Sequence, residues 1–162
     1  MLKLSFDYRT KSWSGIGRYT ENLINNYIGF FKNCEICEIF FLNNNKKNKT
    51  YYIYSASKVF SFSEQFELPI LNFKNKIDLF HSPHFVFPIF NPGKLILTIH
   101  DLTPLLFPDI FSLKARIYMK TMIWLSKFKA DKIITVSQNT KDDLVEMYNY
   151  NPKKIKVIYN GV

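Results

Sequence analysis

The sequence contains few of the residues that define several classes of protein. Two cysteines in 162 residues cannot form a disulfide framework, and five glycines with seven prolines exclude collagen-like and low-complexity chains. No apolar run approaches the roughly 20 residues that a membrane-spanning helix needs. The opening residues reach Asp7 without the apolar stretch of a secretory signal peptide. We therefore expect a single cytoplasmic domain that spans residues 1–162.

Apolar, aromatic and lysine residues are abundant instead. Hydrophobic residues make up 47% of the chain and aromatic residues 17%, enough for a substantial core. The 22 basic residues outnumber the 13 acidic ones, for a net charge of +9, and only three of the basic residues are arginines. A positive surface attracts nucleic acid, anionic lipid or phosphorylated ligands. Because arginine is scarce and no nucleic-acid-binding motif is present, we expect no nucleic-acid partner.

Short apolar runs alternate along the chain with longer amphipathic segments. The short runs predict strands at 1–7, 34–42, 51–54, 78–82, 94–99, 132–136 and 154–159. Helical periodicity predicts helices at 15–32, at 111–129 with Ser112 as N-cap, and from Ser137 or Thr140 to about Asn149. Residues 55–75 give no clear pattern. This order predicts an α/β fold: a Rossmann-like open, mainly parallel sheet with helices on both faces and an interior N-terminal strand.

Glycines follow the first predicted strand, where a parallel sheet binds its ligands. Gly15 and Gly17 open the first helix, so backbone can approach a ligand closely and free N–H groups can face an anion. The dinucleotide-binding fingerprint is incomplete, because Thr20 stands where its third glycine belongs. Phosphate binding and a plain tight turn therefore both remain open from spacing alone.

A histidine and a carboxylate follow the strand predicted at 94–99. His100 is placed where a parallel sheet presents its site residues, and an imidazole suits proton or phosphate chemistry near neutral pH. The alternative is structural, with Asp101 capping the following turn and His100 a satisfied polar neighbour.

Two short motifs contain possible zinc ligands, Cys34-x-x-Cys37 and His81-x-x-His84. Residues three apart in a strand point to opposite faces, so the two thiols cannot converge on one ion. We therefore expect no metal ion.

The predicted helix at 111–129 is basic and amphipathic, with lysines beside Ile117, Trp124 and Phe128. Such a helix can pack its apolar side into the core or lie on an anionic membrane. Both interpretations remain open.

Several segments taken together resemble family 4 glycosyltransferases, especially the mannosyltransferase-like members. They are residues 14–23, 78–83, 97–104, 131–137 and 157–162, in the order in which that family has them. The resemblance implies the GT-B architecture, in which two Rossmann-like domains face each other across a cleft. This sequence resembles the N-terminal, acceptor-side domain, and has no counterpart of the C-terminal donor-binding domain, which would lie in cis or on a separate chain.

The resemblance also implies roles for individual residues. Gly15, Gly17 and Arg18 would bind the donor diphosphate. His100 and Asp101 would be the catalytic residues, acting by positioning and by electrostatic stabilisation of the departing phosphate.

His84 and Ser137 would contact the acceptor. The donor would be GDP-mannose or a UDP-sugar, and the acceptor a glycan or a lipid-linked glycan in cell-surface polysaccharide synthesis. The family retains the anomeric configuration and is expected to need no cofactor here.

Two other functions stay open at this stage. The chain could be a non-catalytic binding or regulatory module derived from the same fold, or half of a split enzyme. Its expected location is the cytoplasm, with peripheral contact at the inner face of the plasma membrane left open. A nucleotide-dependent oxidoreductase is disfavoured by the incomplete glycine fingerprint.

Overall fold

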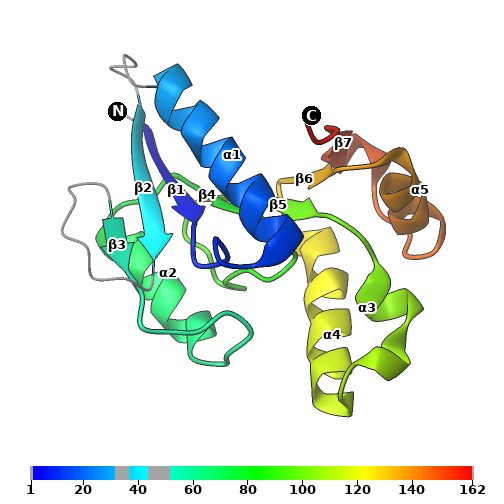
Figure 1. Cartoon of the computed structure of the whole chain (residues 1–162). Coiled ribbons are helices and arrows are strands. Elements are labelled where there is room, and N and C mark those ends of the chain that lie inside the picture. Colours follow the sequence, from blue (N-terminus) through cyan, green and yellow to red (C-terminus); the bar gives the residue numbers. More distant parts are fainter. Residues whose placement is uncertain (1, 32–36, 44–51, 162) are drawn as a thin grey trace.

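The computed structural model describes residues 2–31, 37–43 and 52–161 (Figure 1). The strands in these ranges are β1 (Leu2–Asp7), β2 (Cys37–Asn43), β3 (Tyr52–Tyr54), β4 (Leu79–Ser82), β5 (Lys94–Ile99), β6 (Lys132–Thr135) and β7 (Ile155–Val157). The α-helices are α1 (Ser14–Phe31), α2 (Glu64–Lys74), α3 (Thr103–Leu106), α4 (Leu113–Lys129) and α5 (Gln138–Glu146). Two 3₁₀ turns complete the set, η1 (Pro108–Ile110) and η2 (Pro152–Lys154).

The described strands form one sheet in the order β3-β2-β1-β4-β5-β6-β7, and every neighbouring pair is parallel. β1 lies between β2 and β4, in the interior of the sheet. The predicted parallel sheet with an interior N-terminal strand is therefore confirmed. Because all strands run the same way, their carboxyl ends meet at one edge, which we call the carboxyl edge.

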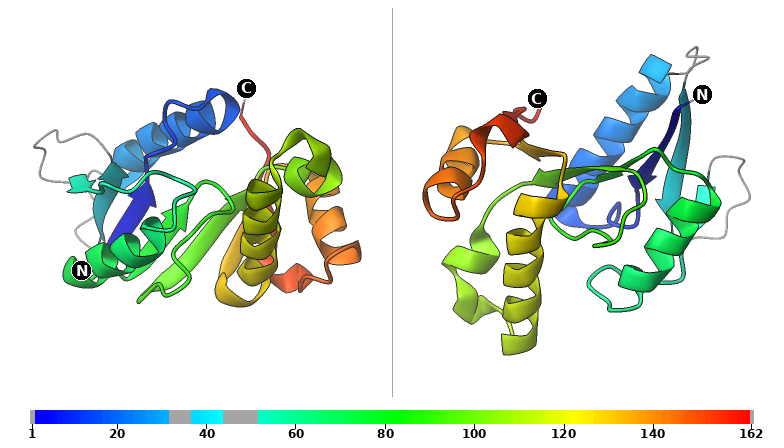
Figure 2. Two further views of the ribbon diagram at one scale, coloured as in Figure 1. Left: turned by 90° about the horizontal axis from the view of Figure 1, so that it is seen from below. Right: turned by 180° about the vertical axis from the view of Figure 1, so that it is seen from behind.

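Helices cover both faces of the sheet, as predicted. On one face, Phe6 of β1 packs against Ile24 of α1. On the other face, a larger core joins the strands to α2, α4 and α5 through Leu68, Ile123 and Leu144. Figure 2 (left) shows α1 on one side of the sheet and α2 with α4 on the other.

Most predicted boundaries agree with the structure. β5 has its predicted bounds, and Ser112 is the N-cap of α4, where its Oγ accepts from the Ala115 N–H. α5 ends at Glu146, before Asn149, whose left-handed φ of 55° stops a helix.

Other segments differ from the predictions or lie outside the described residues. β7 ends at Val157 rather than Tyr159, because its pairing partner β6 ends at Thr135 opposite Val157. Residues 55–75, which gave no clear pattern, contain α2. Cys34 and residues 44–51 lie outside the described residues.

Candidate active site

The first helix begins directly beside the carboxyl edge. The side chain of Tyr19 reaches from α1 to β5, where its hydroxyl lies 3.2 Å from the hydroxyl of Thr98. The Tyr19 ring also meets the His100 ring edge-on, with 4.8 Å between the ring centres. The structure therefore brings the glycine turn and His100 together, although 85 positions of sequence separate Gly15 from His100.

The two glycines of this turn have different surroundings. A side chain at Gly17 would overlap the carbonyl oxygen of Lys11 and lie 2.9 Å from the carbonyl carbon of the same residue. At Gly15, by contrast, no atom lies within 4 Å of the position that a side chain would take. Gly17 is thus required by packing, whereas Gly15 leaves open space beside the helix N-terminus, where an anion is favoured. Arg18 is exposed one residue further along α1.

His100 is half-buried, and its backbone and ring are both held in place. Its Nε2 donates to the carbonyl oxygen of Pro83 at 2.9 Å, because a carbonyl can only accept. In the neutral ring, the lone pair is then on Nδ1. Burial lowers the pKa of His100, with a partial offset from the Pro83 carbonyl and from Asp101.

Asp101 and Ser137 both act as caps. The Asp101 carboxylate accepts from the N–H of Thr103 at the start of α3, which is the structural alternative considered for this residue. Ser137 Oγ accepts from the N–H of Thr140 at the start of α5. The hydroxyl of Thr140 donates in turn to the backbone carbonyl of His100 at 3.1 Å. His100 is therefore contacted by α1, through Tyr19, and by the first turn of α5, through Thr140.

His84 lies inside the protein, 1% exposed. Its Nδ1 accepts from the N–H of Val86 at 3.0 Å, and its Nε2 lies 3.5 Å from Asp7 Oδ2. The ring of Trp13 covers it at 6.1 Å between ring centres. A contact between His84 and an acceptor would require Trp13 or its neighbours to move.

Three buried charged side chains lie beneath the carboxyl edge of the sheet. The Arg9 guanidinium holds Asp7 through two hydrogen bonds of 2.9 and 2.7 Å, and reaches Glu64 of α2 at 2.9 Å. Burial alone would raise the pKa of Asp7, but Arg9 and His84 hold that pKa well below its ordinary value. At Glu64, burial outweighs Arg9 and raises the pKa. We call Asp7, Arg9 and Glu64 the buried charge cluster.

The buried charge cluster also fixes two aromatic residues. Glu64 Oε1 accepts from the backbone N–H of Phe60 and from the hydroxyl of Tyr118, each at 3.0 Å. Phe60 has a left-handed φ of 66°, which is rare for an aromatic residue and is maintained here by surrounding contacts. Burial and the Glu64 charge raise the pKa of Tyr118, so its hydroxyl remains a donor at neutral pH.

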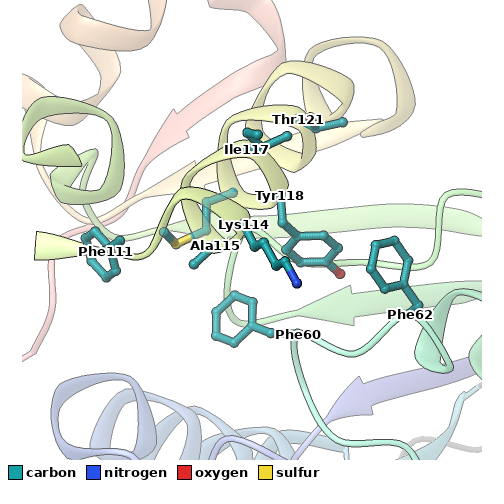
Figure 3. Close-up of a pocket in the computed structure, with 9 residues that line it drawn as sticks. Phe60, Phe62, Phe111, Lys114, Ala115, Ile117, Tyr118 and Thr121 are labelled. Carbon is teal, nitrogen blue, oxygen red and sulfur yellow. The ribbon is translucent and has the colours of Figure 1, made fainter. Parts of the chain in front are cut away.

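The rings of Phe60 and Tyr118 meet edge-on, with 6.2 Å between their centres, and both line a pocket of about 890 Å³. Figure 3 shows Phe60 and Phe62 on the loop side of this pocket, and Lys114, Ile117 and Tyr118 on the α4 side. The lining is mainly aromatic and aliphatic, which suits an apolar group rather than a sugar ring with its hydroxyls.

Sequence reasoning did not single out Arg9, Glu64 or Tyr118. The sequence signal for this cluster is the spacing Asp7-x-Arg9 at the end of a buried strand, since buried charged side chains need partners of opposite charge. Glu64 and Tyr118 could not be paired with it, because they lie 55 and 109 positions away from Arg9.

Among the described residues, no group of three or more His, Cys, Asp or Glu side chains is arranged to hold a metal ion. Within the same ranges, no helix is both long enough and apolar enough to cross a membrane.

Similarity to known proteins shows which family the chain belongs to. The family model of Glycosyltransferase Family 4 matches residues 42–162. The chain belongs to this family. The O-antigen chain mannosyltransferase RfbU of Salmonella typhimurium is 32% identical over 93 residues, which are 57% of this chain and 25% of that protein.

Two solved structures share the fold of this family 4 domain. Anabaena HepE, crystallised in complex with UDP-glucose, superimposes with a TM-score of 0.61 at 15% identity. A glycosyltransferase of Rickettsia africae gives a TM-score of 0.57, also at 15% identity. All, or nearly all, of this chain is covered in both cases, against 44% and 43% of the two relatives. The chain thus spans under half of these structures and a quarter of RfbU.

Proposed function

We propose that this family 4 domain is the acceptor-side half of a glycosyltransferase that retains anomeric configuration. It would transfer a sugar, mannose being the first candidate, from a nucleotide-sugar to a glycan or lipid-linked acceptor in cell-surface polysaccharide synthesis. The observation that carries the proposal is the placement of His100 beside the N-termini of α1 and α5. The resemblance to an O-antigen mannosyltransferase supports mannose and a polysaccharide product.

The carboxyl edge suits one side of a nucleotide-sugar diphosphate. Gly15 leaves room for phosphate oxygens at the α1 N-terminus, where helix N–H groups and the helix dipole favour negative charge. Arg18, exposed in the same turn, would add a positive charge. These groups are preorganised, because Gly17 locks the turn against Lys11.

His100 would act on the departing phosphate. Its Nε2 is committed to Pro83, so Nδ1 is the atom that exchanges a proton at the ligand. A diphosphate next to the ring favours its protonated form, which offsets the effect of burial on the pKa. The protonated ring would donate to the phosphate oxygen as negative charge develops there, an electrostatic role that needs no covalent intermediate.

The other predicted site residues would have supporting roles. Asp101 faces solvent while capping α3, so it could add charge near His100. Ser137 lies at the α5 N-terminus and His84 beneath Trp13, and both would act on the acceptor side. A donor-binding domain, in cis or on a separate chain, would close the cleft and exclude water.

The test is the activity of a two-domain enzyme that contains this chain and a donor-binding domain. In the His100→Ala variant, we expect turnover to fall at least tenfold with little change in the KM for the acceptor, since the lost contact is made at the transition state. The control is Lys156→Ala, an exposed residue of β7. Full turnover in His100→Ala would leave His100 with a structural role only.

A binding or regulatory module derived from the same fold is the second candidate. The burial of His84 favours it, since a residue assigned to the acceptor is covered in this chain. A domain that binds the glycan acceptor with unchanged affinity in His100→Ala and that shows no transfer with any donor domain would fit this second candidate.

A further inference from the structure

A series of polar side chains connects the interior of the sheet to the candidate active site. His81 of β4 is buried, and its Nε2 lies 3.1 Å from the hydroxyl oxygen of Thr98 on β5. Thr98 is also buried, and its hydroxyl meets that of Tyr19 on α1. The ring of Tyr19 then packs against the ring of His100, at 90° to it. Four side chains in contact thus link two strands and a helix to the catalytic candidate.

The proposed transfer reaction uses His100 but assigns no part to the rest of this series. His81 remains neutral near neutral pH, because burial lowers its pKa to about 3. The ring of Phe6 packs edge-on against it, with 4.7 Å between ring centres. Burial also raises the pKa of Tyr19, so its hydroxyl keeps its proton. Since neither group changes its charge near neutral pH, the series is a fixed frame rather than a path for protons.

The imidazole of His100 needs such a frame. The hydrogen bond from Nε2 to the Pro83 carbonyl holds one corner of the ring. A ring held at one corner can still rock about that bond, and rocking would displace Nδ1, the atom assigned to the ligand. The Tyr19 ring opposes this motion from the side of α1, in the edge-to-face geometry that aromatic pairs favour. Tyr19 is itself restrained, because its hydroxyl is bonded to Thr98.

We propose that Tyr19 is a positioning residue for His100. It holds the imidazole at a set distance from the glycine turn, because Tyr19 lies two residues after Gly17 on the same helix (Figure 1). A diphosphate at the α1 N-terminus and a proton on His100 Nδ1 then meet without rearrangement, as electrostatic catalysis requires. This catalytic consequence rests on the proposed function, whereas the positioning of the ring does not.

The titration of His100 reports on the contact with Tyr19. Burial has the largest effect on the pKa of His100 and lowers it, Asp101 raises it, and His84 lowers it. The helices packed against His100 contribute Tyr19 and Thr140, whose hydroxyls are uncharged near neutral pH. Removal of the Tyr19 ring would admit water to His100 and leave Asp101 and His84 in place. The pKa of His100 should therefore rise toward its ordinary value.

The first experiment is a ¹⁵N NMR titration of the three histidine rings in the 162-residue chain, with His100→Gln to identify the His100 signal. In the unaltered chain, neutral His100 should be the tautomer protonated at Nε2. Tyr19→Leu should raise the titration midpoint and give a mixture of tautomers, whereas Tyr19→Phe, which keeps the ring, should stay close to the unaltered chain. The matched control is Tyr27→Leu, because Tyr27 lies about 12 Å further along α1 and packs against Phe6.

The second experiment measures turnover in the two-domain enzyme. Tyr19→Leu should lower kcat about tenfold, equivalent to about 1.4 kcal/mol, with an unchanged KM for the acceptor. Tyr19→Phe should recover most of this loss, and Tyr27→Leu should keep full kcat. Circular dichroism verifies that each variant is folded. Thr98→Val removes the partner of the Tyr19 hydroxyl, so it should also lower kcat, and it replaces Tyr19→Leu if that variant does not fold.

The two experiments separate the possible failures. The same His100 titration and tautomer in Tyr19→Leu and Tyr27→Leu would overturn the positioning of the ring, whether or not the enzyme transfers a sugar. Altered NMR behaviour with undiminished kcat would overturn the catalytic consequence. Altered NMR behaviour in a two-domain enzyme that transfers no sugar even when unaltered would support the positioning and contradict the proposed function.

Discussion

Replacing Arg9 with methionine tests how the buried charge cluster stabilises the end of the sheet. The substitution keeps the length of an unbranched apolar stem but removes the guanidinium. Arg9 makes hydrogen bonds to Asp7, to Glu64 and to the carbonyl of Ser57, the last at 3.2 Å. Its loss therefore leaves two carboxylates buried without their counter-ion.

The expected loss of folding stability follows from the burial of these charged side chains. The side chains of Asp7, Arg9 and Glu64 are each no more than 1% exposed, so water cannot replace the lost partner. Removing one member of a buried ion pair costs about 3–5 kcal/mol. A domain of this kind has about 5–15 kcal/mol of stability in total. At about 2 kcal/mol per molar urea, we expect the unfolding midpoint to fall by roughly 2 M.

Urea unfolding at pH 7, followed by far-UV circular dichroism, measures this loss. The matched control is Arg116→Met, since the pair between Arg116 and Asp109 is 3.5 Å long and exposed, and such pairs contribute little. An Arg9→Met midpoint equal to that of Arg116→Met would refute the reasoning.

The pH dependence gives a second test of the same variant. In the unaltered protein, the pKa of Asp7 is lowered, so its contribution to stability is present at neutral pH and is lost in acid. Without Arg9, both carboxyls should have raised pKa values in the folded state, and protonation would then favour folding. The stability difference between variant and unaltered protein should therefore shrink as the pH falls from 7 toward 5.

Two further predictions concern the glycine turn and a buried histidine. Gly17→Ala should destabilise the fold, because the methyl group would overlap the Lys11 carbonyl, whereas Gly15→Ala should unfold at equal or higher urea yet lose nucleotide-sugar binding. Burial lowers the pKa of His81 to about 3, so acidification from pH 7 to 5 should cost about 2 kcal/mol, as the unfolded chain takes up the proton. Urea titrations at both pH values should show that His81→Asn has lost this dependence.

Much of the fold could be predicted because its strands have clear limits. Pro92 and Gly93 precede β5 and His100 follows it, so its bounds were evident from the sequence. α2 was missed for a physical reason. Its buried side carries the polar residues Glu64 and Asn72, whereas its outward residues Phe66 and Ile70 are apolar, so the segment lacks the usual amphipathic pattern of a surface helix.

The candidate site was predictable only in part. His100 could be found because a polar residue at the end of a buried strand is unusual. A parallel sheet also binds its ligands at the carboxyl ends of its strands, where His100 lies. The link from its carbonyl to Thr140, and the reach of Arg9 to Glu64, depend on side-chain packing between distant segments. No local pattern encodes such contacts.

The central claim is that the carboxyl edge forms one side of a nucleotide-sugar site. Two-dimensional ¹H–¹⁵N NMR of the 162-residue chain, titrated with GDP-mannose and UDP-glucose, tests it most directly. We predict saturable shifts of the Gly15, Gly17 and His100 amides, with a Kd in the millimolar range (about −4 kcal/mol), because the 162 residues would form only one side of the proposed site. Shifts confined to other parts of the chain, or micromolar binding accompanied by sugar transfer, would contradict the account.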